Sequence, residues 1–251
     1  MRALLRTRRW IAFTVLVIVA IAAFGLLSRW QWMRAEEQRA QRLQIATESA
    51  LLPVSVAQAV QEGAAEWAPI LIEGRYEPDS TALVRQRPLD GRNGFWVASL
   101  LAADDGTRVW VVRGWVPAGD SATAAVPAPP APEGAVRIEG RWRVAEQSVP
   151  RTTDLPAGQV RSVDPASLEA ADSGDGTGLP DHYVEAVSSV PADPGVVPLP
   201  APAIDEGRNI SYAVQWLLFA VIAIGGWLFF LRREARDESA AGQQESTWTS
   251  A

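Results

Sequence analysis

Residues 11–27 of this chain read IAFTVLVIVAIAAFGLL and residues 210–231 read ISYAVQWLLFAVIAIGGWLFFL, without a charged side chain in either stretch. A helix over the second stretch is about 33 Å long at 1.5 Å per residue, which matches the hydrocarbon core of a bilayer, about 30 Å. Including Trp10 and Ser28 extends the first stretch. Because backbone polar groups in lipid must be satisfied within the segment, we predict transmembrane helices over residues 10–28 and 210–231.

The arginines predict the orientation of both helices. They stand just before the first stretch and just after the second, at Arg2, Arg6, Arg8, Arg9, Arg232, Arg233 and Arg236. Basic residues mark the cytoplasmic side, so residues 1–9 and 232–251 are expected in the cytoplasm, the latter as a disordered tail. Residues 29–209 then form an extracytoplasmic domain. Tryptophans favour the membrane interface, and five lie near the ends of the stretches: Trp10, Trp30, Trp32, Trp216 and Trp227.

Two other interpretations of the N-terminus remain open. An Arg-rich start, an apolar run and Ala20-Ile21-Ala22 are also typical of a cleavable signal peptide, and Thr7-Arg8-Arg9 faintly resembles a twin-arginine signal. The apolar run is long for a signal, so we favour a retained helix. No amphipathic, acid-poor transit peptide precedes it, which favours a multi-pass protein of a bacterial plasma membrane over one of an organelle.

Composition excludes several kinds of site. The chain has no cysteine, so disulfides and thiolate metal sites are absent. Residues 30–207 hold 14 Arg against 25 Asp and Glu, a net charge of −11. Without a basic patch, binding to nucleic acid is not expected; the expected surroundings are membrane lipid.

The region between the two apolar stretches changes its pattern along its length. Residues 29–50 are rich in helix formers and predict a helical stalk, and residues 54–61 a short helix after Pro53. Strands are predicted at residues 67–76, 82–87, 95–101, 107–116, 136–144, 160–163 and 183–190. Asp105-Gly106 predicts a hairpin turn, and Asp164-Pro165 predicts the N-cap of a helix over 165–171. The fold class is therefore a membrane protein of the α+β class, in which two transmembrane helices flank a mainly antiparallel small barrel or sandwich.

One short pattern occurs twice in this region. Residues 72–76 read IEGRY and residues 138–142 read IEGRW. Each predicts a strand that bends at its glycine. We interpret the echo as two strands of one sheet that use the same device, with an internal duplication as the alternative.

Three ordered motifs resemble a known family. Leu27-Ser28-Arg29-Trp30-Gln31-Trp32-Met33-Arg34 resembles its Trp-Gln-x-x-Arg signature just outside the first membrane helix. Gly94-Phe95 with Val112-Arg113-Gly114-Trp115-Val116-Pro117 resembles its central signature. Asn209-Ile210-Ser211-Tyr212-Ala213-Val214-Gln215-Trp216 resembles its third, which opens the second membrane helix. The family is the surfeit-locus-protein-one family of cytochrome c oxidase assembly factors, and the resemblance covers almost the whole chain.

The resemblance implies a non-enzymatic factor of respiratory chain biogenesis. Members assist maturation of the haem a-containing catalytic subunit of cytochrome c oxidase, which is the implied partner. They act beside the haem a synthase, a second implied partner, and haem a is the implied transient ligand. No resident metal or other cofactor is expected.

One residue departs from the family pattern. The third motif commonly carries His three residues before the Tyr, as a proposed haem ligand, whereas this chain has Asn209. An amide is a poor ligand for haem iron, so a helix cap is the alternative role for Asn209. His182 is the single histidine, and we interpret it as a loop residue. Asp172, Asp175 and Asp181 lack the spacing of a calcium loop.

The other candidate binding residues come from the three motifs, each with a structural alternative. Gln31 and Arg34 are three apart and share a helix face beside Trp30; an Arg fork there suits a haem propionate or a partner helix. Arg113 interrupts an apolar strand beside Gly114 and Trp115. The structural alternatives to a binding role are an ion pair for Arg113 and a bulge at Gly114. Tyr212, Gln215 and Trp216 open the second helix, where they bind a partner or pack on the first helix. Gly225-Gly226 permits close approach of the helices.

Three other functions compete with the assembly factor. A copper chaperone needs Cys, Met or His ligands, and this chain has no Cys, one His and two Met. A hydrolase would want a G-x-S-x-G nucleophile elbow, and a haem-modifying oxidase a pair of intramembrane histidines; neither is present. A generic membrane scaffold or sensor without haem contact remains as the alternative, because of Asn209.

Overall fold

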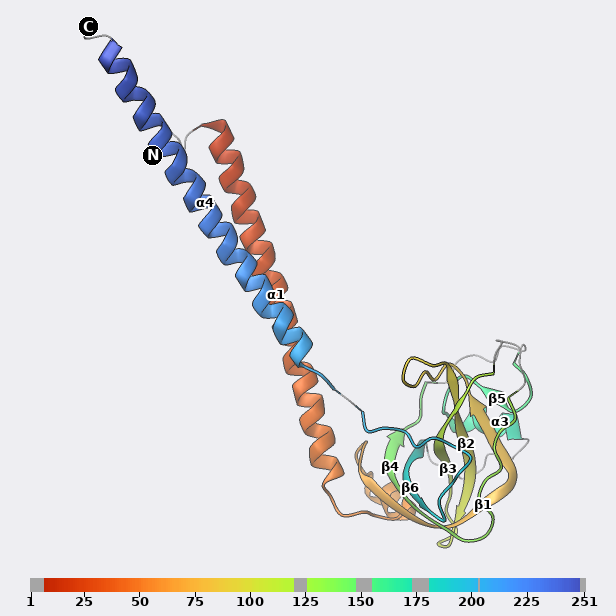
Figure 1. Ribbon diagram of the computed structural model, residues 1–251. Helices are drawn as coiled ribbons and strands as arrows, with labels where there is room; N and C mark the ends of the chain where they lie inside the picture. The colour runs from red at the N-terminus through yellow and green to blue at the C-terminus, as the bar shows by residue number, and fades with distance from the viewer. Residues whose placement is uncertain (1–6, 120–125, 148–154, 173–180, 203, 249–251) are drawn as a thin grey trace. The chain divides into compact units, whose positions relative to one another are not determined.

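The computed structural model describes residues 7–119, 126–147, 155–202 without 173–180, and 204–248 (Figure 1). These residues form two compact units, one within Met1–Arg42 and Ala203–Ala251 and the other within Leu43–Pro202. The first unit contains most of α1 (Arg8–Ser49) and all of α4 (Gly207–Trp248). The second contains the sheet and two short helices, α2 (Val56–Glu62) and α3 (Pro165–Asp172).

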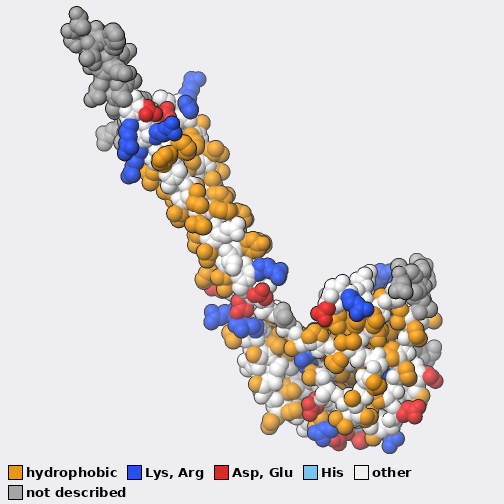
Figure 2. Space-filling view, in the orientation of Figure 1, with side chains coloured by type: hydrophobic (Ala, Val, Ile, Leu, Met, Phe, Trp, Pro, Cys, Tyr) orange, Lys and Arg blue, Asp and Glu red, His pale blue; other side chains and the backbone are white. Residues whose placement is uncertain are grey.

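Both long helices are apolar enough and long enough to cross a membrane. Figure 2 shows hydrophobic side chains covering the middle of the helix pair, with charged side chains near its ends. α1 runs without a break from the predicted span into the predicted stalk, as expected. α4 continues past Leu231 to Trp248, where we expected a disordered tail. Residues 232–244 are rich in Arg, Glu, Ala and Gln, which are strong helix formers.

α1 contacts α4 along one narrow, antiparallel seam. Ser28 Oγ donates a hydrogen bond to the Ala213 carbonyl at 2.9 Å, and Trp227 Nε1 donates to Thr14 Oγ1 at 3.1 Å. Residues of α1 at this seam recur in steps of seven or fourteen. One series is Trp10, Phe24, Gln31 and Gln38, and the other is Thr14, Ser28 and Ala35. A seven-residue spacing is the signature of coiled-coil packing. The remaining faces of both helices expose large apolar side chains.

The sheet of the second unit closes into a small barrel. Its strands are β1 (Pro69–Val84), β2 (Gly94–Ala103), β3 (Arg108–Pro117), β4 (Val136–Val144), β5 (Gln159–Val160) and β6 (His182–Val190). The order is β2-β3-β6-β4-β1-β5, and β1 also pairs with β2, which closes the ring. Pairing is antiparallel except between β3 and β6 and between β1 and β5. A mainly antiparallel small barrel is therefore confirmed.

Both faces of the barrel strands are covered. Successive strand residues point to opposite faces, so Val109 and Val111 join one hydrophobic cluster, whereas Trp110 and Val112 join another. The first cluster includes residues of α2, and the second includes Leu168 of α3. This double coverage explains why residues 109–112 of β3 are all apolar instead of alternating with polar residues.

Most predicted elements appear near their expected bounds, with three differences. The strands predicted at 67–76 and 82–87 are one strand, β1, whose pairing with β2 shifts between Tyr76 and Thr81. α2 begins at Val56, after a capping box made by Ser55 and Gln58, and not at residue 54. Only Gln159–Val160 form a strand where 160–163 was predicted. The predicted hairpin turn is confirmed, with Gly106 at φ +85°.

The repeated pattern lies in two strands that pair with each other. Ile72 of β1 stands opposite Ile138 of β4. A Cβ added at Gly74 would lie 2.2 Å from the Ala102 carbonyl oxygen, and one added at Gly140 would lie 2.4 Å from Val184 Cγ1. Each glycine is therefore required where a neighbouring strand approaches closely, which agrees with two strands using one device.

Candidate functional site

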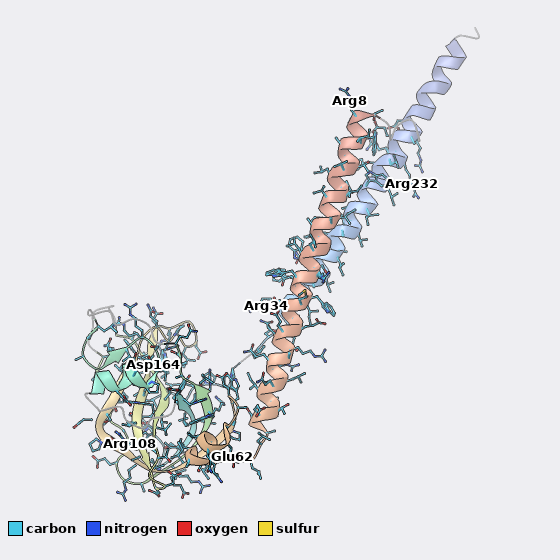
Figure 3. The ribbon with its side chains drawn as sticks, turned by 180° about the vertical axis from the view of Figure 1, so that it is seen from behind. Arg8, Arg34, Glu62, Arg108, Asp164 and Arg232 are labelled. Carbon is cyan, nitrogen blue, oxygen red and sulfur yellow. The ribbon has the colours of Figure 1, made fainter. Side chains whose placement is uncertain are left out.

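The ten candidate residues fall into both units. Arg113, Gly114 and Trp115 lie in the barrel. Trp30, Gln31 and Arg34 lie on α1 and Asn209, Tyr212, Gln215 and Trp216 on α4, within the helix pair. Figure 3 shows Arg34 part of the way along α1.

Arg113 fills a bulge in β3 and binds two distant loops. Val97 stands opposite Gly114 while Ala98 stands opposite Val112, so Arg113 is the extra residue. Its Nε donates to Asp193 Oδ2 at 2.7 Å. Its Nη1 and Nη2 donate to the Pro129 and Pro130 carbonyls at 3.0 and 2.8 Å. The side chain is 1% exposed. These contacts make Arg113 the anchor of the segments around Pro129 and Asp193.

The rest of the central motif holds one indole ring. Trp115 Nε1 donates to the Arg87 carbonyl at 2.6 Å. A Cβ added at Gly94 would lie 2.2 Å from the Trp115 ring, so only glycine leaves room for it. A Cβ at Gly114 would lie 2.6 Å from the Val197 carbonyl oxygen, and that oxygen accepts the Trp115 N–H at 2.8 Å. The spacing of Gly94, Gly114 and Trp115 is thus a packing requirement of the barrel.

Polar residues gather at one end of the helix pair. Asn209 Nδ2 donates to Gln38 Oε1, and Arg42 pairs with Glu206 at 2.7 Å. The capping role considered for Asn209 is wrong, because α4 begins two residues earlier, at Gly207, whose N–H is accepted by Asp205 Oδ1 at 2.9 Å. The side chain of Asn209 joins the two helices instead.

The first motif places its polar residues in different surroundings. Gln31 is half-buried in the seam, and its Oε1 is buried with no hydrogen-bond donor among the described residues. Arg34 is exposed and pairs with Glu37 at 3.1 Å. Trp30 is 60% exposed. Gln31 thus belongs to the helix contact, whereas Trp30 and Arg34 are open to a partner.

The third motif is divided in the same way. Trp216 stacks on Phe24 of α1, with ring centroids 5.8 Å apart. Tyr212 is 45% exposed and Gln215 is also exposed. A Cβ at Gly225 or Gly226 would meet nothing within 4 Å, so neither glycine is a point of close approach to α1.

His182 begins β6, not a loop, and its ring stacks on Trp142 at a centroid distance of 4.8 Å. Burial lowers the pKa of His182 below its ordinary value. Asp172 and Asp175 lie outside the residues whose side chains are described. Among the described residues, no group of three or more His, Asp or Glu could hold a metal ion.

Sequence reasoning missed one charged cluster on the barrel. Glu185 is 4% exposed, and its carboxylate accepts hydrogen bonds from Arg141 at 2.6 Å and Arg143 at 2.8 Å. Arg143 also lies 3.8 Å from the centre of the Trp67 ring. Arg141 and Arg143 at alternate positions of β4 indicate a charged face of this strand, but nothing in the sequence indicates that Glu185 faces them.

The fold defines a class: a closed small barrel carried between two helices that are apolar enough to cross a membrane. Comparison with known families identifies which one. The SURF1 family model matches residues 18–221, so the chain belongs to the SURF1 family, as the three motifs predicted. Members of that family are generally cytochrome oxidase assembly factors, a class that is not enzymatic. Uncharacterised SURF1-like proteins of Mycobacterium bovis and Mycobacterium tuberculosis are each 28% identical over 236 residues, covering 90% of this chain and 85% of theirs.

Proposed function

We propose that this chain is a membrane-anchored assembly factor that assists maturation of the haem a-containing catalytic subunit of cytochrome c oxidase. Family membership over residues 18–221 is the observation that carries the proposal. The catalytic subunit is the proposed partner, and the haem a synthase a second one. Delivery of haem a to the catalytic subunit is the proposed step.

The proposed location is a bacterial plasma membrane, with α1 and α4 as the two spans. Arginines precede the apolar stretch of α1 and follow the apolar stretch of α4. Arg8 and Arg232 lie at the same end of the helix pair (Figure 3). By the positive-inside rule that end faces the cytoplasm, and the barrel is then extracytoplasmic.

The candidate residues do not fit ligation of haem iron, whose usual protein ligands are His, Met, Cys or Tyr. Asn209 is hydrogen-bonded to Gln38, and His182 is stacked on Trp142 in the barrel. Tyr212 is the one residue of the ten with a suitable atom, and it is exposed without a histidine beside it. We therefore propose that haem a delivery is assisted through contacts with the catalytic subunit and not through a bond to the haem iron, with Trp30, Arg34, Tyr212 and Gln215 as the contact residues.

The alternative is a membrane scaffold or sensor without haem contact. The Asn209–Gln38 hydrogen bond favours it, because the residue that replaces the family's histidine serves the helix pair. Purified protein that binds no haem a but still co-purifies with the catalytic subunit would support this alternative.

The test is a reduced-minus-oxidised absorbance spectrum of membranes from a strain that lacks this gene. We expect loss of the haem a band and its return with a plasmid copy. A Trp30→Ala, Arg34→Ala version should not restore the band, since it removes both contact residues proposed within the first motif. The matched control is Arg39→Ala, Gln41→Ala, a pair of exposed residues on the same helix. Immunoblotting confirms equal amounts of each version, and an unchanged band in the deletion strain refutes the proposed function.

A further inference from the structure

A cavity of about 340 Å³ opens at the end of the helix pair where α1 begins. Arg9, Trp10 and Phe13 of α1 line it, together with Phe230 and Glu234 of α4. Arg8 and Arg232, labelled in Figure 3, lie at this same end. The cavity therefore stands where the apolar surface of both helices gives way to charged residues.

Aromatic rings form the walls of this cavity. Trp10 and Phe13 meet edge to face with centroids 5.7 Å apart, and Phe13 meets Phe230 in the same manner at 6.4 Å. Trp10 also packs with Leu231, and both are largely buried. The ring faces of such a wall attract cations.

The two charged groups at the cavity are opposite in sign and are not joined to each other. Ion pairs within the described part of the helix pair are Arg34–Glu37 and Arg42–Glu206. Arg9 and Glu234 thus present a guanidinium and a carboxylate that are both available to a ligand. The Trp10 indole N–H is buried and has no acceptor among the residues that the structure describes. The cavity thus combines a site for an anion, a site for a cation, and an apolar wall.

We infer that this cavity binds the headgroup of a zwitterionic phospholipid that carries a phosphate and a primary ammonium, as phosphatidylethanolamine does. Arg9 binds the phosphate, for which a guanidinium is well suited. Glu234 accepts hydrogen bonds from the ammonium, which also lies against the aromatic wall. The acyl chains follow the exposed apolar faces of the helices. This inference rests on the proposed placement of α1 and α4 in a membrane, and adds a lipid ligand to it.

The full chain, reconstituted into nanodiscs of equimolar dioleoyl phosphatidylethanolamine, phosphatidylcholine and phosphatidylglycerol, tests the inference. Native mass spectrometry then counts the lipids that remain bound after release from the disc. We expect phosphatidylethanolamine to be retained over phosphatidylcholine, whose quaternary ammonium cannot donate to Glu234. Glu234→Gln should lower that ratio roughly three- to fivefold, the range of a partly exposed charge contact. Arg9→Gln should lower retention of all three lipids.

Matched controls are Asp237→Asn and Arg232→Gln, exposed charges on α4 that do not line the cavity. An unchanged ratio in Glu234→Gln, or an equal fall in Asp237→Asn, overturns the inference. So does preferential retention of phosphatidylglycerol. Flotation of the chain with vesicles after a carbonate wash is measured in parallel. A chain that floats but shows no lipid preference refutes the headgroup site alone, whereas one that does not float refutes the membrane placement itself.

Discussion

Replacing Arg113 with methionine should destabilise the barrel strongly. The sequence left open whether Arg113 belongs to a binding site or to a structural ion pair, and this substitution tests the structural role. The guanidinium is 1% exposed and the Asp193 carboxylate is 9% exposed. Methionine preserves much of the volume of Arg113 but donates no hydrogen bond. Asp193 would then lose the guanidinium and keep the Gly195 N–H, and the Pro129 and Pro130 carbonyls would lose the N–H groups that Arg113 donates to them.

The size of the effect follows from the burial of the pair. Removing one partner of a buried ion pair costs about 3–5 kcal/mol, because the remaining charge stays buried without compensation. For a unit of this size each kcal/mol lowers Tm by about 2–4 °C, so Arg113→Met should lower Tm by about 6–20 °C. Asp193→Asn should cost less, because both proline carbonyls still accept from the guanidinium. Adding Asp193→Asn to Arg113→Met should recover part of the loss, since no buried charge is then left unpaired.

Near-UV circular dichroism of the full chain in detergent follows the barrel, since Trp110, Trp115 and Trp142 are buried in it. The control is Arg137→Met, which breaks an exposed pair with Glu73 and should cost no more than about 1 kcal/mol. Equal Tm values for Arg113→Met and the wild type, or strictly additive effects of the Arg113 and Asp193 changes, would refute a stabilising role for the buried Arg113–Asp193 ion pair.

Three further predictions concern the second unit. Gly94→Ala should displace the Trp115 ring, break its bond to the Arg87 carbonyl and cost about 1–3 kcal/mol; the near-UV melt measures this, and an unshifted Tm would contradict it. Asp164 is the N-cap of α3, and its carboxylate accepts the Ser167 N–H at 3.0 Å. Asp164→Ala should lower the free energy of unfolding by about 1 kcal/mol, measured by chemical denaturation, whereas Glu133→Ala should leave it unchanged. His182 has a lowered pKa in the folded state, so the unfolded state binds more protons as the pH falls through the ordinary value of 6.5. The contribution of His182 to the stability of the folded state is therefore present above pH 6.5 and lost below it. The Tm values at pH 5.5 and 7.5 should differ less in His182→Gln than in the wild type.

The elements that the sequence predicts well are those set by local patterning. Apolar runs predicted α1 and the membrane-length part of α4, and Asp105-Gly106 and Asp164-Pro165 predicted a turn and a cap that the structure contains. Pro78 and Asp79, which are poor strand residues, lie between the strands predicted at 67–76 and 82–87. A shift in pairing with β2 absorbs them and keeps β1 continuous.

Contacts between distant residues could not be predicted in the same way. Arg113 binds Asp193, 80 residues away, and Asn209 binds Gln38, 171 residues away. A single sequence does not indicate which polar groups such residues will meet. The motifs identified the correct positions, but whether a residue is buried and paired depends on the packing of the whole unit.

The closed ring of strands limits how another protein can recognise the barrel. A strand at an open edge offers unpaired N–H and C=O groups, and a partner peptide can extend the sheet there. In the described barrel, each of the five long strands has a paired neighbour on both sides, although β3 and β6 pair only at Val111–Val184 and Val112–Glu185. Recruitment by strand addition therefore has little open edge to use on these five strands. A partner must select this domain through its side chains and the shape of its loops, so single-residue substitutions on its surface should be enough to change which partner it accepts.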